Sequence, residues 1–122
     1  MKIFLTGIQG FLGSTLAARF RAQGWQMAGS ARTPKSAEVA RLALGETPEA
    51  SLFAGVDVVI HAAYDPKAGL EANHRGTALI RDAAARAGVA RQIFVSSYSA
   101  RADAPSIYGQ MKYTLEQEFL RA

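Results

Sequence analysis

The sequence predicts an α/β fold: a doubly wound parallel sheet in which strands alternate with helices through right-handed crossovers. A short apolar run, 1–6, passes through a glycine-rich turn into a segment with helical spacing, 11–23. The segment 57–63 is a nearly continuous apolar run, which is typical of a strand buried on both faces of a parallel sheet. Another apolar run, 92–97, follows a helical stripe over 70–87.

The other elements complete this alternation. A second strand is expected at 25–31, because Pro34 follows it and cannot continue a ladder. We expect a short third strand at 39–44, a brief helix at 49–54 and a last helix from Ile107 to the end of the chain. The sequence contains no repeat or linker. It therefore predicts one domain spanning 1–122.

Composition narrows the class of protein. With 49% hydrophobic and 20% charged residues, the chain is typical of a globular domain and not of a disordered one. No apolar stretch approaches the roughly 18 residues of a membrane span, and no secretory presequence is present, so we expect a cytoplasmic protein without a membrane partner. The chain has no cysteine and two histidines, which predicts no metal site.

The net charge of +4 and the pI near 9.8 raise the question of nucleic-acid binding. The arginines are spread through predicted helices and turns and form no basic block. A mixed, solvated surface is therefore the better interpretation, and we expect no nucleic-acid partner.

The glycine-rich turn over 6–13 is the strongest functional motif. Gly7 permits a tight turn, Gly10 lets the main chain approach a pyrophosphate, and Gly13 lets the helix pack close to the strand. The start of the helix adds unpaired N–H groups and the positive end of the helix dipole. A strand, a glycine turn and a helix in this order open a dinucleotide-binding unit.

The chain resembles the short-chain dehydrogenase/reductases in three features that follow one another in the same order. These are the turn 6–13, the segment 57–63, and Ser97 with the pair Tyr108 and Lys112. The resemblance is to the NAD(P)-dependent epimerase/dehydratase type and covers almost the whole chain. It implies a Rossmann fold that binds NAD(P).

Tyr108 and Lys112 lie four residues apart on a predicted helix, so both side chains project from one face. A free tyrosine ionises near pH 10, and a nearby ammonium stabilises the phenolate. Ser97, at the end of the fifth strand, lies where ligands bind in open α/β sheets. The resemblance implies the same roles: Tyr108 as acid or base, Lys112 on the nicotinamide ribose, and Ser97 orienting the substrate, with Ser99 as its competitor.

Asn73 falls where relatives place an asparagine that organises water and the helix near the active site, so it joins the catalytic candidates. Its alternative role is a helix N-terminal cap. His61 lies in an apolar strand and is expected to be a core histidine, and His74 to be solvated.

The end of the second strand bears on the choice of cofactor. Ala31 stands where NAD-preferring relatives usually have an acidic residue, and Arg32 follows with a guanidinium suited to a 2′-phosphate. NADP is therefore the favoured cofactor. NAD is the alternative, with Arg32 stacked on adenine. The residues expected to contact the cofactor are Gly7, Gln9, Gly10, Phe11, Leu12, Gly13, Arg32, Ala62, Ala63, Tyr108 and Lys112.

These features predict an oxidoreductase or epimerase-like enzyme that transfers hydride between nicotinamide and a small carbonyl or alcohol substrate. The rival hypothesis is a catalytically silent module that binds NADP as a sensor or structural ligand. The interval from Ser97 to Tyr108 is shorter than in sugar-nucleotide epimerases, which argues against a nucleotide-sugar substrate.

Members of this family continue beyond the Tyr/Lys helix with further strands and a smaller substrate-binding part. Here the sequence ends at Ala122. We therefore expect a Rossmann domain that is incomplete on its C-terminal side, and a fragment of a longer protein. Completion by a partner chain is the alternative, and a homodimer is left open.

Overall fold

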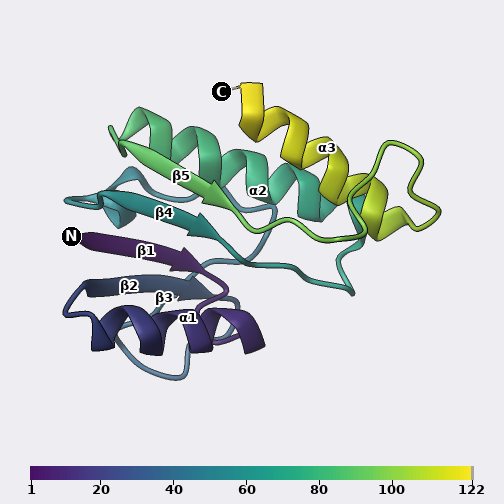
Figure 1. Cartoon of the computed structure of the whole chain (residues 1–122). Coiled ribbons are helices and arrows are strands. Elements are labelled where there is room, and N and C mark those ends of the chain that lie inside the picture. The colour runs from purple at the N-terminus through teal and green to yellow at the C-terminus, as the bar shows by residue number, and fades with distance from the viewer. Residues whose placement is uncertain (122) are drawn as a thin grey trace.

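The computed structural model describes residues 1–121 and confirms the predicted fold class. Five parallel strands form one sheet in the order β3-β2-β1-β4-β5. In chain order the elements are β1 Lys2–Thr6, α1 Phe11–Ala22, β2 Gln26–Ala31, β3 Ala40–Arg41, η1 Ala50–Phe53, β4 Val58–His61, α2 Gly69–Arg86, β5 Arg91–Phe94 and α3 Ile107–Arg121. Figure 1 shows all strands pointing toward one edge of the sheet.

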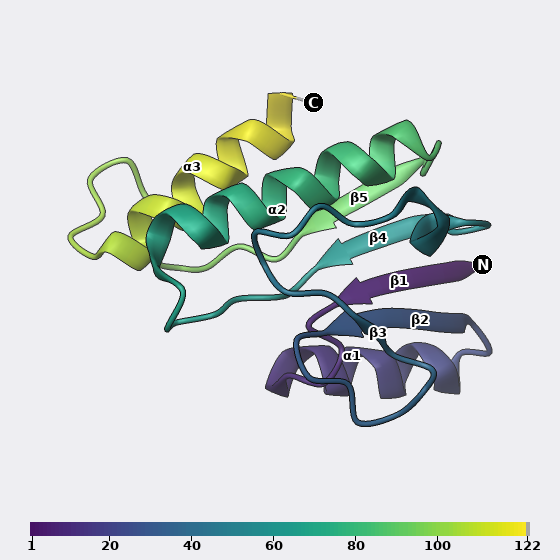
Figure 2. The same ribbon diagram turned by 180° about the vertical axis from the view of Figure 1, so that it is seen from behind.

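The sheet has a helix layer on each face, with α1 on one side and α2 and α3 on the other (Figures 1 and 2). The strands β1 and β4 are buried on both faces, so their apolar residues alternate between two cores. The core beside α1 comprises Ile3, Leu5, Ile8, Ala17, Val58 and Ile60. The core beside α2 and η1 comprises Phe4, Phe53, Val56, Val59, Ile80, Ala83 and Ala84.

Helix α3 packs beside α2 and over the end of the sheet formed by β4 and β5. Phe119 of α3 stacks on Phe94 of β5 with ring centroids 5.0 Å apart, and meets the ring of His61 edge-on at 4.9 Å. Met111 and Leu115 are buried on the same helix. These contacts set the position of the helix that carries Tyr108 and Lys112.

Several predicted elements are shorter than expected. The fourth strand, predicted at 57–63, is Val58–His61. The third strand is reduced from 39–44 to Ala40–Arg41, and the helix at 49–54 is a 3₁₀ turn. The fifth strand ends at Phe94 instead of 97. It pairs only with β4, and β4 itself ends at His61, opposite Phe94, so the ladder has no partner beyond this point. The prediction that Ser97 lies at the strand end is therefore wrong, since Ser97 lies three residues beyond it.

Candidate nucleotide and catalytic site

A cavity of about 350 Å³ lies at the carboxyl edge of β1, β2 and β4. Its walls come from the turn after β1, from the ends of β2 and β4, and from two leucines after β3. In open parallel sheets, ligands bind outside the carboxyl ends of the strands where the strand order reverses. Here that reversal falls between β1 and β4. Of the predicted cofactor contacts, Gly7, Gln9, Gly10, Arg32, Ala62 and Ala63 line this cavity.

The glycine turn has the geometry that its sequence predicts. Gly7 has a φ of +67°, and a Cβ there would lie 2.9 Å from the Cα of Ala63. A Cβ on Gly13 would overlap the carbonyl oxygen of Gly7. The N–H of Gly10 donates to the same oxygen at 2.9 Å, which closes the turn.

Helix α1 begins directly after this turn, at Phe11. Its Gly10 cap offers no side chain to the first N–H groups, and its first turn carries no acidic residue. Those N–H groups are the ones that a helix leaves for an anion. The side chains of Phe11 and Leu12 are exposed, and neither these two residues nor Gly13 line the cavity, although all three were predicted to contact the cofactor.

Thr6 joins β1 to β4 where both strands end. Its hydroxyl oxygen accepts hydrogen bonds from the N–H groups of Ala62 at 3.0 Å and Ala63 at 3.1 Å. The backbone therefore leaves the sheet ladder at Ala62 and passes the Gly7 turn closely. This buried hydroxyl, which the sequence analysis did not single out, sets the floor of the cavity.

Gln9 uses its side chain to hold the loop after β2. Its Nε2 donates to the carbonyl of Thr33 at 3.0 Å, and its Oε1 accepts from the N–H of Lys35 at 2.7 Å. Gln9 was predicted to contact the cofactor, but both ends of its side-chain amide are already hydrogen-bonded to the protein backbone. Its contribution is to fix the cavity wall that carries Arg32.

Arg32, predicted to receive a 2′-phosphate, is paired with an acidic residue. Its Nη1 lies 2.6 Å from Oδ2 of Asp65, in the loop after β4. Both residues line the cavity. The ion pair thus crosses from the end of β2 to the end of β4 within the cavity.

Asn73 is buried in the second turn of α2 and binds the same loop. Its Oδ1 accepts from the N–H of Asp65 at 2.8 Å, and its Nδ2 donates to the carbonyls of Asp65 at 2.7 Å and Gly69 at 2.6 Å. The side chain does not cap the helix in the usual sense, because it lies inside α2. It holds the loop in place, which is a positioning role.

Tyr108 and Lys112 project from one face of α3, and Tyr64 joins them to the cavity. The rings of Tyr64 and Tyr108 meet edge-on with centroids 4.8 Å apart, and Tyr64 itself lines the cavity. The Nζ of Lys112 lies 5.7 Å from the Tyr108 ring centroid and 4.8 Å from that of Phe94. The cavity and the Tyr/Lys pair are therefore neighbours at one edge of the sheet.

Lys112 is buried with its charged end inside the protein, being 5% exposed. Burial lowers the pKa of its ammonium from the usual value, because a charge is less well solvated there. Nζ donates to the carbonyl of Val95 at 2.9 Å. An ammonium has three N–H donors, so this bond orients the group and leaves donors for another acceptor.

Ser97 lies in the loop between β5 and α3, where its Oγ accepts a hydrogen bond from the N–H of Ser99 at 3.1 Å. The two serines that competed for one role are thus partners in a local turn. Neither residue lines the cavity, nor do Tyr108 and Lys112.

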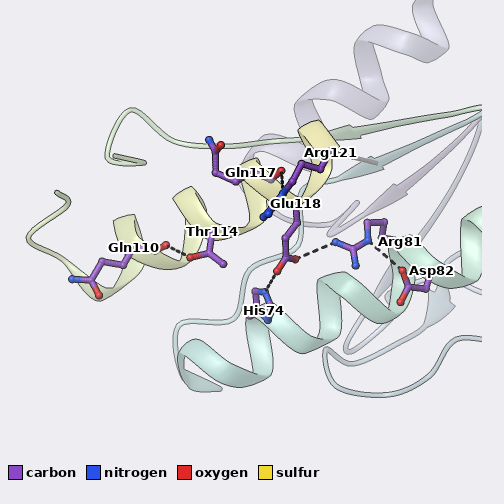
Figure 3. A network of polar contacts seen from close by, with 8 residues as sticks. All are labelled: His74, Arg81, Asp82, Gln110, Thr114, Gln117, Glu118 and Arg121. Carbon is purple, nitrogen blue, oxygen red and sulfur yellow. Dashed lines mark hydrogen bonds and ion pairs between the residues drawn. The ribbon is translucent and has the colours of Figure 1, made fainter. Parts of the chain in front are cut away.

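A polar network holds α3 against α2 (Figure 3). Glu118 accepts from Arg81 at 3.1 Å and contacts Nε2 of His74 at 2.9 Å. Burial of the Glu118 carboxyl raises its pKa, but the hydrogen bonds from His74 and Arg81 outweigh this effect, so the pKa is lowered from the usual value. His74, expected to be solvated, keeps 35% of its side chain exposed and is in addition paired with Glu118 across the helix interface.

His61 is a core histidine, as predicted, and is 3% exposed. Its Nε2 shares a hydrogen bond with Oε1 of Gln92 at 2.7 Å, whereas its Nδ1 has no partner among the described residues. Burial lowers the pKa of His61 to about 4, because the interior disfavours the imidazolium. Its ring therefore stays neutral near pH 7.

Two negative findings concern residues 1–121. No helix there combines the length and the apolar character that crossing a bilayer requires. In the same range, no three His, Asp or Glu side chains gather closely enough to hold a metal ion.

The strand order, the glycine turn and the cavity at the strand ends define a Rossmann-type fold. The chain belongs to the NAD dependent epimerase/dehydratase family, whose model matches residues 3–121. This assignment confirms the resemblance on which the sequence analysis relied.

Among its relatives is an uncharacterized protein of Mycobacterium tuberculosis, 37% identical over 103 residues, which are 80% of this chain and 12% of that protein. A short-chain dehydrogenase/reductase superfamily protein from Agrobacterium tumefaciens with bound NAD has a TM-score of 0.70 and 28% identity, covering 99% of this chain and 44% of that one. MoeE5 in complex with UDP-glucose and NAD has a TM-score of 0.81 and 24% identity, covering 99% and 48%. The chain thus spans about half the length of these structures and an eighth of the mycobacterial protein.

Proposed function

We propose that this chain binds NAD(P) along the carboxyl edge of its sheet and that the whole protein transfers hydride between the nicotinamide and a carbonyl or alcohol substrate. One observation carries the proposal: Tyr64 lines the nucleotide cavity and contacts Tyr108, so that cavity and acid/base candidate adjoin. Family membership makes an enzyme of the short-chain dehydrogenase/reductase type the expected class.

The fit to a dinucleotide rests on the turn after β1. Side chains at Gly7 and Gly13 would fill the space next to the backbone, and α1 presents its N-terminus there without an acidic residue. These features suit a pyrophosphate. When bound, the nicotinamide supplies or accepts the hydride.

The chain's own residues supply the proton transfer in this proposal. Tyr108 donates a proton to an alkoxide or accepts one from an alcohol. The ammonium of Lys112, oriented by Val95, keeps a positive charge beside the Tyr108 ring and offers its free donors to ribose hydroxyls. The Ser97 hydroxyl orients the substrate oxygen.

For the cofactor, we keep the expectation that Arg32 favours NADP over NAD, and that either dinucleotide enters the cavity. The two solved structures described above contain NAD. Arg32 is the cation at the end of β2 that suits a 2′-phosphate, provided that it leaves Asp65.

For the substrate, we propose a small carbonyl or alcohol compound. MoeE5 was solved with a nucleotide sugar, whereas only ten residues lie between Ser97 and Tyr108 here. The proposal is completed by a cytoplasmic location, without nucleic-acid or membrane partners.

The test is carbonyl-dependent oxidation of NADPH and NADH by the full-length protein and by Tyr108→Phe. We expect Tyr108→Phe to lower kcat/KM by about 10³-fold while dinucleotide affinity changes less than about twofold, because only the proton donor is lost. Tyr98→Phe is the matched control, since Tyr98 is fully exposed in the preceding loop and should keep full activity.

Equal activity of the wild type and Tyr108→Phe would contradict the acid/base role. A wild type that binds NADPH tightly but does not oxidise it in the presence of any carbonyl compound would instead support the silent binding module.

A further inference from the structure

We propose that Asp65 sets the cofactor selectivity of this site, by occupying the guanidinium of Arg32 and thereby opposing a 2′-phosphate. The inference rests on the proposed dinucleotide binding. It adds Asp65 to Arg32 as a determinant of cofactor selectivity.

The first support is the contact between the two side chains. Arg32 Nη1 and Asp65 Oδ2 are 2.6 Å apart, a short charge-assisted hydrogen bond. The side chain of Arg32 is 62% exposed, whereas that of Asp65 is 23% exposed. Arg32 is therefore the more exposed partner of the pair, and Asp65 is the more enclosed one.

The second support is that the carboxylate is fixed from behind. The buried side chain of Asn73 binds both the N–H and the carbonyl of Asp65. The N–H of Lys67 donates to Oδ1 at 3.0 Å, which sets the rotation of the carboxylate. Many surface ion pairs contribute almost nothing because both side chains must be ordered, but here the acid is ordered already.

The third support is the placement of the pair within the cavity that the nucleotide would enter. Both residues line it, with Tyr64 and Pro66 beside Asp65. A 2′-phosphate held by Arg32 would have to displace the carboxylate or lie close to it, and like charges at short range repel. A ribose hydroxyl, in contrast, can donate to a carboxylate, so NAD loses nothing.

The structure thus assigns opposite effects to the two residues. Arg32 attracts the 2′-phosphate, and Asp65 weakens that attraction. The preference of the site for NADP over NAD then depends on the difference between these two effects. Removal of the Asp65 carboxylate alone should increase the preference for NADP.

The experiment uses two probes that lack nicotinamide: 2′,5′-ADP, which carries the 2′-phosphate, and 5′-ADP, which does not. Calorimetric affinities are measured for the full-length wild type, Asp65→Asn, Arg32→Gln and the double variant. We expect Asp65→Asn to bind 2′,5′-ADP about tenfold more tightly, with a change below about twofold for 5′-ADP. In the double variant most of the gain should be lost, because no guanidinium remains to be released and only the direct repulsion between the Asp65 carboxylate and the phosphate is relieved.

Unchanged affinity of Asp65→Asn for 2′,5′-ADP, with 5′-ADP bound normally, would overturn the inference and leave the proposed function intact. An equally large gain in the double variant would also overturn it, since release of Arg32 would then not be the cause. A wild type that binds neither probe would overturn the proposed nucleotide site itself. If Asp65→Asn does not fold, Asp65→Ser provides the same removal of charge and keeps an acceptor for the Lys67 N–H.

Discussion

The candidate site has an end proposed to bind the nucleotide and an end proposed to be catalytic, called here the nucleotide end and the catalytic end, and the two are built in different ways. At the nucleotide end, the backbone makes the site: the turn from Gly7 to Gly13 closes on itself, and Thr6 binds the chain as it leaves β4. At the catalytic end, side chains from distant segments make it. Lys112 reaches the carbonyl of Val95, and Glu118 binds two residues of α2.

The difference teaches where each end is vulnerable. A backbone-built turn tolerates no added atom next to its main chain, because close-packed backbone has little room to shift. A helix held by side chains can lose one contact and shift slightly, with a smaller loss of stability. Three variants, ordered by the size of the expected effect, test this contrast.

The largest effect is expected for Gly13→Ala, because its Cβ would overlap the carbonyl oxygen of Gly7. We expect the free energy of unfolding to fall by about 4 kcal/mol, at the upper end for a single substitution, together with loss of 5′-ADP binding. Urea denaturation and calorimetry measure the two quantities.

Gly10→Ala is the matched control, since its Cβ would lie 3.2 Å from the same oxygen, and the turn can adjust by a few tenths of an ångström. A Gly13→Ala protein as stable as Gly10→Ala would show that the turn is not the rigid part of the site.

The next effect concerns pH and the buried His61 beneath α3. Its pKa is about 4 in the folded protein and about 6.5 when unfolded, so between these values the unfolded chain binds more protons. Stability is therefore fully present above pH 6.5 and is lost as pH falls toward 4. We expect this one group to remove about 2 kcal/mol between pH 7 and pH 4.5.

His61→Leu isolates that contribution, because it removes the titrating ring and keeps an apolar side chain against Phe119. The variant also removes the hydrogen bond between His61 and Gln92, which lowers the free energy of unfolding at every pH. The quantity compared is therefore the change in unfolding free energy between the two pH values, from which this constant loss cancels. Identical pH dependence in both proteins would mean that His61 is not shielded in the folded state.

The smallest effect is expected for Glu118→Gln, which weakens the network in Figure 3. We expect a loss of about 1 kcal/mol in unfolding free energy, as for other partly exposed ion pairs. Affinity for 5′-ADP should stay within about twofold, because the network lies at the catalytic end.

Asp82→Asn serves as the control, since Asp82 is about half exposed and contacts the same arginine, Arg81, at 3.3 Å. Its effect should stay below about 0.5 kcal/mol. A Glu118→Gln protein that loses 5′-ADP binding along with stability would show that the two ends are not independent.

The fold was predictable because its signals are local. The apolar runs in β1 and β4, the turn at Gly7 and the helical stripe of α2 each lie within a few consecutive residues. The third and fifth strands were predicted too long, because strand ends depend on whether a neighbouring strand is there to pair with. Nothing near Ser97 in the sequence shows that β4 ends at His61.

Within the site, the sequence pointed to Arg32 and Asn73 but missed Asp65, which both of them contact. A signal existed, since Asp65 follows the end of a buried strand as Arg32 does, and the carboxyl ends of parallel strands meet at one edge. Their pairing across 33 positions was still beyond reach. Tyr64 was missed for the same reason, because its contact with Tyr108 joins the loop after β4 to helix α3, 44 positions further along the chain.

By itself, the sequence determined the class of fold, the glycine turn and the shared face of Tyr108 and Lys112, since each depends on residue types at fixed short spacing. Only the tertiary structure decided which charges meet: Arg32 with Asp65, Glu118 with Arg81, and the Lys112 ammonium with a carbonyl. The physical reason is that backbone geometry repeats along the chain, whereas a long side chain binds whatever the packing of the sheet and helices places within its reach.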